Sequence, residues 1–379
     1  MDFRAVRADF DIPDERAYLN TAFLGPMPRV AVHAGQEALT AKSHPWEISA
    51  DTFFAPVDEL RTVLASILGG DDDGVALMPS VSYGIAVAGA NLSVPAGSTI
   101  VVMAEQFPSN VYEWRAVAER SGAEIRTVSP TPDGWTAALL EAIDERTSVV
   151  AIEPCHWSDG GVVDVVAVGD AARAVGSGFV VDVSQTLGAV PFPLAAAQPD
   201  FVVGVLYKWL LGAYGTACLW AAPRWREGRT VEHNWMSRAG SSDFSQLVHY
   251  TDSFRPGARR FDAGEVASHA NIASTLAAAR VVAAWDANGV TEHARGLTTS
   301  LVERAAELGF SAPPSDQRSP HLIGLHLPAG GPPAATVSAA LAEAQVHVSI
   351  RGTAIRVSAH AFNTTADIDR LITVLNQLG

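Results

Sequence analysis

The stretch Asp200-Phe-Val-Val-Gly-Val-Leu-Tyr-Lys208-Trp-Leu-Leu-Gly212 places a lysine at the end of an apolar run, just before a glycine-bearing turn. Such a run is typical of a buried strand, and α/β folds place their chemistry where strands end. A lysine at this position is either a surface charge or an amine held for Schiff-base formation. A second feature upstream bears on the choice.

That feature is Phe179-Val-Val-Asp182-Val-Ser184-Gln185, another strand-like run, which ends in a carboxylate. A lysine that forms an aldimine with pyridoxal phosphate needs an acidic partner, because the pyridine nitrogen must stay protonated for the ring to accept electrons. Taken singly, Asp182 is equally interpreted as a turn or cap residue and Lys208 as a surface charge. Together they are the pair that this cofactor requires.

Length and composition limit the classes of protein that this chain can form. Its 379 residues suffice for one large α/β domain and a smaller one, and a net charge of −15 disfavours nucleic acid and anionic membranes as partners. Cys155 and Cys218 lie in apolar stretches and are expected to be reduced structural thiols of a cytoplasmic protein. The N-terminus lacks the apolar core of a secretion signal.

One uncharged stretch, Gly74 to Ala104, raises the alternative of a membrane span. Pro79, Asn91 and Pro95 interrupt it, so a buried core segment is expected instead.

Strand-like runs recur along the first two thirds of the chain, with helix-like stretches such as Val165–Val175 between several of them. This alternation predicts a mainly parallel, doubly wound sheet. The predicted strands are Gly74–Met78, Thr99–Ala104, Ser148–Glu153, Phe179–Val183 and Asp200–Tyr207.

The pattern changes after about Ser253, where an Ala-rich helical region, Ala270–Asn288, is followed by short alternating elements. A small α+β domain is expected there, and Thr364 with Asp367 predicts the start of its last helix. Its predicted strands are His321–Leu327, Val346–Ile350 and Ala354–Ser358, and its predicted helices are Ala335–Ala344 and Thr365–Leu378.

Three further segments suit a cofactor site, although each also has a structural interpretation. Met78-Pro-Ser80-Val-Ser82 resembles a turn that feeds a helix N-terminus, where backbone N–H groups favour a phosphate. Phe107 follows a strand, so its ring either stacks on a pyridine or fills the core. Arg351 and Arg356 lie on adjacent short strands, and one of them could bind a substrate carboxylate.

Other chemistries have little support in the sequence. The histidines show no HExxH or paired Cys-His spacing, so a metal site is not expected. No GxSxG elbow indicates a catalytic serine, and no GxGxxG or GxxxxGK[ST] loop indicates a nucleotide-dependent enzyme.

Taken together, these segments resemble the class-V aminotransferase family of fold-type I pyridoxal-phosphate enzymes. This family includes cysteine desulfurases, selenocysteine lyases, kynureninases and isopenicillin-N-epimerase-like proteins. The resemblance runs from Tyr18-Leu-Asn20-Thr-Ala-Phe-Leu-Gly25-Pro to Ile355-Arg356-Val-Ser358-Ala-His-Ala-Phe362-Asn363-Thr364. It implies an α/β fold with a large, mainly parallel doubly wound sheet and a smaller C-terminal α+β domain.

The implied division has three parts. Residues 1–30 form an N-terminal segment that contributes to the active site and the small domain. Residues 31–255 form the large domain that binds the cofactor. Residues 256–379 form a linking helix and the small domain.

The resemblance also implies roles for individual residues. Lys208 forms the internal aldimine and later moves protons, Asp182 pairs with the pyridine nitrogen, and Gln185 hydrogen-bonds the ring oxygen. The implied phosphate ligands are Ser80, Val81, Ser82 and Tyr207, the implied stacking ring is Phe107, and the implied substrate-binding residues are Asn20, His156 and Arg356, of which Arg356 binds the carboxylate.

The chain departs from the family pattern in three places. Neither Cys155 nor Cys218 lies where catalytic desulfurases carry their mobile-loop cysteine, which disfavours persulfide chemistry. Glu265 replaces the family's Thr that contacts phosphate from a neighbouring subunit. His156-Trp157 stands where relatives often present an Asn near the substrate.

The sequence therefore predicts a cytoplasmic, homodimeric enzyme that uses pyridoxal 5'-phosphate on a small-molecule substrate, an amino acid, through a Lys208 aldimine and a Cα carbanion. A lyase that eliminates a β or γ group by carbon–sulfur cleavage is the first expectation. An aminotransferase or an epimerase on the same scaffold is the alternative. The alternative from another class is a non-catalytic module that binds a ligand or a partner.

Overall fold

The computed structural model describes residues 1–378, and its largest element is a seven-stranded sheet in the order β2-β8-β7-β6-β5-β3-β4. Strand β8 is antiparallel to both of its neighbours, and the other ladders are parallel. The strands are β2 (Val75–Met78), β3 (Thr99–Met103), β4 (Glu124–Val128), β5 (Thr147–Ile152), β6 (Gly178–Asp182), β7 (Phe201–Val205) and β8 (Ala217–Ala221). The five predicted strands are confirmed, whereas β4 and β8 were not predicted.

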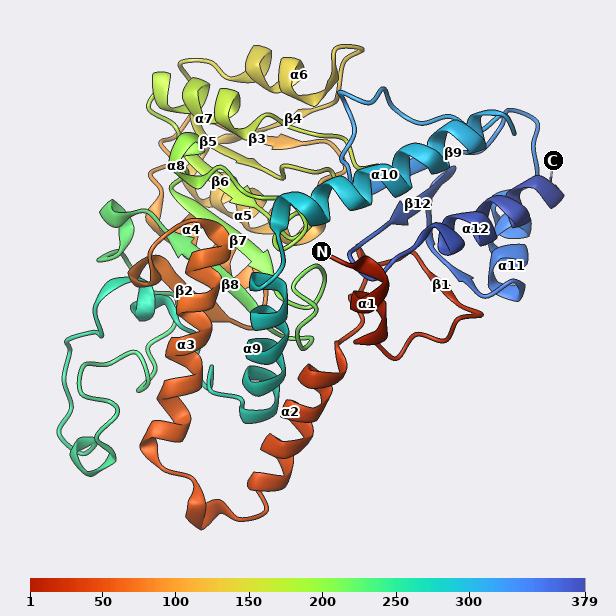
Figure 1. Cartoon of the computed structure of the whole chain (residues 1–379). Helices are drawn as coiled ribbons and strands as arrows, with labels where there is room; N and C mark the ends of the chain where they lie inside the picture. The colour runs from red at the N-terminus through yellow and green to blue at the C-terminus, as the bar shows by residue number, and fades with distance from the viewer. Residues whose placement is uncertain (379) are drawn as a thin grey trace.

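Helices cover both faces of this sheet, so the expected doubly wound fold is confirmed (Figure 1). Successive strand residues point to opposite faces, and Val180 and Val181 accordingly belong to two different cores. One face packs against α3 (Ala50–Leu68), α6 (Gly134–Ala142), α7 (Val165–Ala174), α8 (Leu194–Ala197) and α9 (His269–Ala283). The other face packs against α4 (Val81–Asn91) and α5 (Tyr112–Ser121).

A second, smaller core surrounds a three-stranded antiparallel sheet in the order β11-β12-β9. Figure 1 shows these blue strands beside the C-terminal helices, with α10 running toward them from α9. Strand β1 pairs in parallel with β10, so the N-terminal segment is joined to this part of the chain. The remaining elements are α1 (Phe3–Ala8), β1 (Ala17–Tyr18), α2 (Arg29–Ala41), α10 (Ala287–Ala306), β9 (Leu322–His326), α11 (Ala334–Glu343), β10 (Val346–His347), β11 (Ser349–Arg351), β12 (Ala354–Ser358) and α12 (Thr365–Leu378).

Two details differ from the sequence-based expectation. The helical region Ala270–Asn288 is two helices, because the extended backbone at Asp286 ends α9 and starts α10 in a new direction. The segment Val346–Ile350 is divided between two strands, since β10 pairs with β1 while β11 pairs with β12. Side-chain periodicity reveals neither the break between the two helices nor the change of pairing partner between the two strands.

The uncharged stretch from Gly74 to Ala104 forms β2, α4 and β3, whose side chains are largely buried in the two cores of the large sheet. Among the helices of residues 1–378, none is long and apolar enough to cross a membrane.

A buried ion pair ties α3 to the segment that follows the 3₁₀ helix Gly257–Phe261. The Arg61 guanidinium donates to Asp262 through Nη1 and Nη2, at 3.0 and 2.5 Å, and Nη1 also donates to Val75 O at 2.8 Å. Leu77 N donates to Asp262 Oδ1 at 2.8 Å, which connects the pair to β2. Because both charges are buried, each depends on the other for stability.

We predict that Asp262→Ala lowers the free energy of unfolding by about 3–5 kcal/mol, because it leaves the Arg61 charge buried without its partner. Chemical denaturation monitored by circular dichroism measures this loss. The matched control is Asp73→Asn, which breaks the Asp73–Arg259 pair whose carboxylate is 58% exposed, and its cost should stay within about 1 kcal/mol. Equal losses in the two variants would contradict this ranking.

Candidate active site

The carboxyl ends of β2, β5, β6 and β7 lie at one edge of the central sheet, because β2 and β7 are both antiparallel to β8 and the others are parallel to β7. Asp182 is the last residue of β6, and Lys208 follows the end of β7. The Ser80–Ser82 turn connects β2 to α4 at this same edge. Ligand sites of open α/β sheets lie outside the carboxyl ends of such strands.

Lys208 is buried, with 7% of its surface exposed. Burial lowers the pKa of its amine to about 8, and the nearby Arg356 and Arg351 act in the same direction, while Asp182 and Glu153 oppose them. Near neutral pH a larger fraction of this amine than of an exposed lysine is therefore unprotonated and nucleophilic. The only other lysine in the chain is Lys42, which is exposed on the surface.

The N-terminal segment packs directly on the Lys208 backbone. Gly25 N donates to Tyr207 O at 2.9 Å, and a Cβ atom at Gly25 would lie 2.0 Å from Lys208 O. Only glycine fits there, so this residue fixes how the N-terminal segment approaches the site.

The Asp182 carboxyl is buried and accepts a 2.9 Å hydrogen bond from Ser184 N. Burial raises the pKa of Asp182, although Ser184 and the Lys208 charge favour the ionised form. A buried carboxylate of this kind is stabilised by a cation placed beside it.

Aromatic rings and guanidinium groups gather around Lys208. Its Nζ lies 5.2 Å from the centroid of the Phe107 ring, and Phe107 packs edge-on against Trp157 with centroids 5.4 Å apart. The guanidinium groups of Arg351 and Arg356 lie 5.5 and 5.8 Å from the Trp157 ring. Arg356 also donates to Trp157 O at 2.8 Å. The structure thus brings Lys208, Phe107 and Arg356 together, as the sequence predicts, and adds Trp157.

Asn20 is linked to Arg356 through Ser349. Ser349 Oγ donates to Asn20 Oδ1 at 2.8 Å, and Arg356 Nη2 donates to Ser349 Oγ at 3.4 Å. Burial lowers the pKa of Arg356 to about 10, with a further contribution from Arg351. Within residues 1–378, the buried Nε atoms of both arginines have no hydrogen-bond partner. One buried and one partly buried cation, Arg356 and Arg351, with unused donors are suited to an anionic ligand.

Gln185 is held by contacts within the chain. Its Oε1 accepts from Trp209 Nε1 at 3.0 Å, and its Nε2 donates to Ala22 O at 3.2 Å. Trp209 in turn packs against His321 and His360. Burial lowers the pKa of each histidine to about 4. These neutral rings connect the loops that follow Asp182 and Lys208 to the C-terminal part of the chain.

His156 lies away from the open part of this cluster, stacked on Trp135 with ring centroids 4.8 Å apart. Its Nε2 is 3.0 Å from Ala104 O, and its Nδ1 is 3.1 Å from Asp159 Oδ1. Burial opposes a charge on His156, but the hydrogen bond and charges of its neighbours outweigh burial and raise its pKa. Both ring nitrogens of His156 thus have partners within the chain. Of the adjacent residues His156 and Trp157, it is Trp157 that lies beside Phe107.

The predicted phosphate turn caps α4. Ser80 Oγ accepts from Tyr83 N at 3.3 Å and lies 2.9 Å from Ser82 Oγ. The first N–H groups of a helix lack partners in the preceding turn, so those of Val81 and Ser82 suit an anion. Tyr207, next to Lys208, is half-buried and packs against Tyr214 with the two rings tilted by 47°.

Besides Trp157, sequence reasoning did not select two further residues of the site. Glu153 follows β5 and is buried beside Asp182, and Trp209 orients Gln185. The position of Glu153 at the end of a predicted strand was the available signal, because Asp182 was selected on the same basis.

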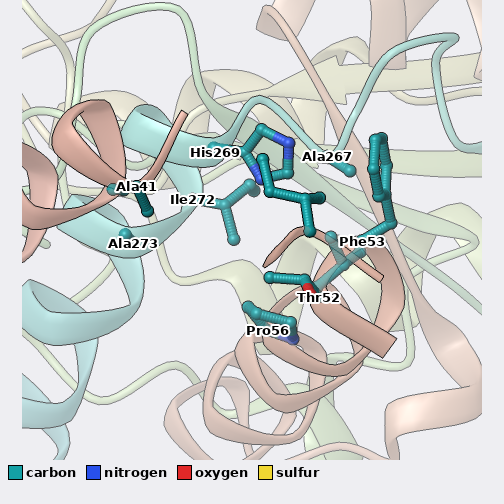
Figure 2. Close-up of a pocket in the computed structure, with 11 residues that line it drawn as sticks. Ala41, Thr52, Phe53, Pro56, Ala267, His269, Ile272 and Ala273 are labelled. Atoms are coloured by element: carbon teal, nitrogen blue, oxygen red, sulfur yellow. The ribbon is translucent and has the colours of Figure 1, made fainter. Parts of the chain in front are cut away.

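A separate apolar cavity of about 160 Å³ lies between α2, α3 and the start of α9. Figure 2 shows Phe53, Thr52 and Pro56 of α3 facing His269 and Ile272 of α9 across it. None of its lining residues belongs to the Lys208 cluster, and the side chains are mainly aliphatic or aromatic. It is therefore a feature of helix packing outside the candidate active site.

The fold and this cluster define an α/β enzyme with a buried lysine at a sheet edge. A family model described as aminotransferase class-V matches residues 46–371. The chain therefore belongs to the class-V aminotransferase family, whose enzymes use pyridoxal 5'-phosphate.

Relatives with several different activities are similar to this chain. Isopenicillin N epimerase from Streptomyces clavuligerus is 27% identical over 383 residues, which covers 95% of this chain and 94% of the epimerase. A kynureninase from Deinococcus radiodurans is 30% identical over 270 residues, covering 68% of this chain and 63% of the kynureninase. The cystine C–S lyase C-DES, solved with its product cysteine persulfide, matches with a TM-score of 0.85 at 18% identity, covering 96% of this chain and 98% of that one. At this low sequence identity, the match to C-DES shows that the two proteins share a fold.

The residues of the site fit this cofactor. Asp182 offers a buried carboxylate that a pyridinium nitrogen would neutralise, and the start of α4 offers free N–H groups to a phosphate. Lys208 would supply the amine, and the Phe107 ring lies beside it. The fit thus extends from the lysine to both ends of the cofactor.

We predict that Lys208→Ala abolishes the visible absorbance that the purified protein shows with pyridoxal phosphate, because the buried nucleophilic amine is lost. The matched control is Lys42→Ala, which removes the other lysine and should leave the spectrum unchanged. Loss of absorbance in the Lys42 variant, or an unchanged spectrum in the Lys208 variant, would contradict the assignment.

Proposed function

We propose that the protein is a lyase that acts on an amino acid and breaks a carbon–sulfur bond at the β or γ position. The observation that carries this proposal is the buried Lys208 amine, with a pKa of about 8, between Asp182 and Arg356. When bound, pyridoxal phosphate supplies an electron-accepting ring that weakens the bonds at the substrate's α-carbon. The protein's own residues determine which bond is broken.

Arg356 is suited to bind the substrate's α-carboxylate. Its guanidinium is buried, its Nε has no partner within residues 1–378, and Trp157 O and Ser349 fix its other nitrogens. A planar, fixed guanidinium binds a carboxylate through two hydrogen bonds. Asn20 contributes through Ser349, which it holds in place.

Lys208 is the base that removes the α-proton. Its lowered pKa leaves a neutral fraction of the amine at neutral pH, and burial beside Phe107 keeps bulk water away from it. Asp182 would pair with the ring nitrogen of the bound cofactor and would keep that nitrogen protonated.

One base is sufficient for elimination, whereas epimerisation requires proton exchange on both faces of the α-carbon. The guanidinium groups of Arg351 and Arg356, which lie 5.5 and 5.8 Å from the Trp157 ring, do not exchange protons near neutral pH. These two groups supply no second base, which favours elimination over epimerisation.

A cysteine nucleophile does not take part in the proposed reaction. Cys155 and Cys218 are free thiols, both 1% exposed, and burial raises the pKa of each above that of a free cysteine. A thiol in such surroundings is a poor nucleophile. The proposed products are therefore a keto acid, ammonia and a sulfur-containing leaving group.

We predict that cysteine S-conjugates give keto acid and ammonia in equal amounts while the bound cofactor keeps its original absorbance. Coupled assays of both products, recorded with the visible spectrum, measure this outcome. The control is Arg356→Lys, which keeps the charge but loses the paired donors, and it should raise KM by roughly tenfold or more. Keto acid without ammonia, together with a change of the cofactor to its amine form, would instead identify an aminotransferase.

We also propose that the protein is a cytoplasmic homodimer. Helix α2 and the following turn expose apolar side chains at Val30, Val32, Leu39 and Trp46, next to the cavity of Figure 2. An exposed apolar patch of this kind supports self-association. The two buried reduced thiols support a reducing compartment, which cell fractionation tests.

Sedimentation velocity should give twice the chain mass at micromolar concentration. Leu39→Glu should shift the protein toward the monomer, because it places a charge in the proposed interface. The control is Leu140→Glu, since Leu140 is also an exposed leucine but lies on α6. A wild-type monomer at this concentration would contradict the proposal.

A further inference from the structure

Glu153 lies beside Asp182 on the neighbouring strand. In the parallel ladder of β5 and β6, Ile152 pairs with Val181, and Glu153 and Asp182 are the next residues along their chains. Ala151 and Val180 both belong to the core that faces α4 and α5. Because strand side chains alternate, Glu153 and Asp182 extend toward this same face. Two carboxyl groups are therefore neighbours at the sheet edge that holds Lys208.

The Glu153 carboxyl is almost without polar partners. It is 2% exposed, and its hydrogen bond within residues 1–378 is a long one from Trp157 N, at 3.4 Å. His156 Nε2 is 4.0 Å from Glu153 Oε1, but that nitrogen lies 3.0 Å from Ala104 O. No lysine or arginine of the described chain lies within ion-pair distance of it. A buried carboxyl in these surroundings favours its neutral form.

The charges around Glu153 act in both directions. Burial raises its pKa to about 8; His156, the Trp157 N–H and Lys208 lower the pKa, and Asp182 raises it. The net effect leaves a proton on Glu153 at neutral pH. Two adjacent buried carboxyls do not readily both ionise. Asp182 accepts a 2.9 Å hydrogen bond from Ser184 N, whereas Glu153 accepts only the 3.4 Å one from Trp157 N, so the negative charge is better stabilised on Asp182.

We propose that Glu153 is a positioning residue of the cofactor site, a carboxylic acid kept protonated beside Asp182 so that Asp182 alone carries the charge that faces the pyridine nitrogen. This inference rests on the proposed function, because it assigns Glu153 a role toward the bound cofactor. Along the sheet edge, the phosphate turn follows β2, Lys208 follows β7, Asp182 ends β6 and Glu153 follows β5. Glu153 thus lies on the side of Asp182 opposite to the phosphate turn.

The proton on Glu153 makes the charge of the site depend on pH. Near neutral pH the pair of carboxyls carries one negative charge, on Asp182, and above about pH 8 Glu153 adds a second. The second charge favours a proton on the Lys208 nitrogen, because opposite charges stabilise each other at short range. Glu153 therefore raises the pH at which Lys208 loses its proton.

The first experiment is a pH titration of the visible spectrum of the protein loaded with pyridoxal phosphate. Glu153→Gln keeps the shape and hydrogen-bonding capacity of a neutral carboxyl but never ionises. It should move the spectral midpoint to lower pH by roughly half a unit or more. Glu105→Gln is the matched control, because Glu105 follows β3 at the same sheet edge but is exposed, and its titration should coincide with that of the wild type.

The second experiment measures thermal stability against pH in the Lys208→Ala background without cofactor. Glu153 has a pKa of 4.5 in the unfolded chain and about 8 in the folded one. Its contribution is therefore fully present below about pH 4.5 and is lost as the pH rises to about 8. Between about pH 4.5 and pH 8, the Lys208→Ala protein should lose stability relative to the same protein that also carries Glu153→Gln. Above about pH 8 the stability curves of the two proteins should run parallel.

Replacing the neighbour tests whether the two carboxyls interact. In an Asp182→Asn background the Glu153-dependent loss of stability should shift to lower pH, because the adjacent negative charge is gone. If Glu153→Gln does not fold, Glu153→Met, of similar volume, takes its place in each comparison.

Coincident spectral titrations of wild type and Glu153→Gln would overturn the proposal, even if the stability curves differ, because Glu153 would then be only a buried acid. Coincident stability curves would overturn it as well. Protein that gains no absorbance with pyridoxal phosphate refutes the proposed function, and the stability series then separately decides whether Glu153 is protonated beside Asp182.

Discussion

The burial of one amine next to one carboxyl is the constraint on which the site depends. An ammonium ion loses much of its hydration when it is buried, and Lys208 is surrounded by two guanidinium groups that add repulsion. Asp182 is the charged acidic group that opposes this cost near neutral pH, where Glu153 keeps its proton. The balance holds the lysine pKa near 8, which is suitable for both a nucleophile and a base at neutral pH.

Such a balance requires side chains from distant parts of the chain to stay in register. The parallel ladders place the ends of β5, β6 and β7 side by side, and Gly25 packs the N-terminal segment on the Lys208 backbone. Trp209 connects Gln185 to the buried rings of His321 and His360. The two sheets are thus joined through the residues that flank the site, so its geometry depends on both cores.

Sequence alone predicted the part of the site that follows from strand ends. Lys208 and Asp182 end apolar runs, and parallel strands bring such ends together, so their proximity needs no detailed packing. The antiparallel β8 was not predicted, because its run, Ala217–Ala221, is short and gives no sign of its direction. The division of 346–350 between two strands depends on pairing with β1, which is distant in sequence.

The surroundings of individual side chains could not be predicted from the sequence either. His156 and Trp157 are adjacent in sequence, but the strand end directs one ring toward Trp135 and the other toward Phe107. Glu153 was overlooked because an acid after a strand is common, and only its neighbours make its charge costly. The identity of a residue can be read from the sequence, whereas its desolvation depends on everything that packs around it.

The central claim is that Lys208 is the amine that holds pyridoxal phosphate. Reduction of the loaded protein with borohydride, followed by peptide mapping in a mass spectrometer, tests it most directly, because the chain offers only Lys208, Lys42 and the N-terminal amine for labelling. The account predicts a pyridoxyl group on the peptide that contains Lys208 and none on the other two. Labelling of Lys42 or of the N-terminus, with Lys208 unmodified, would contradict it.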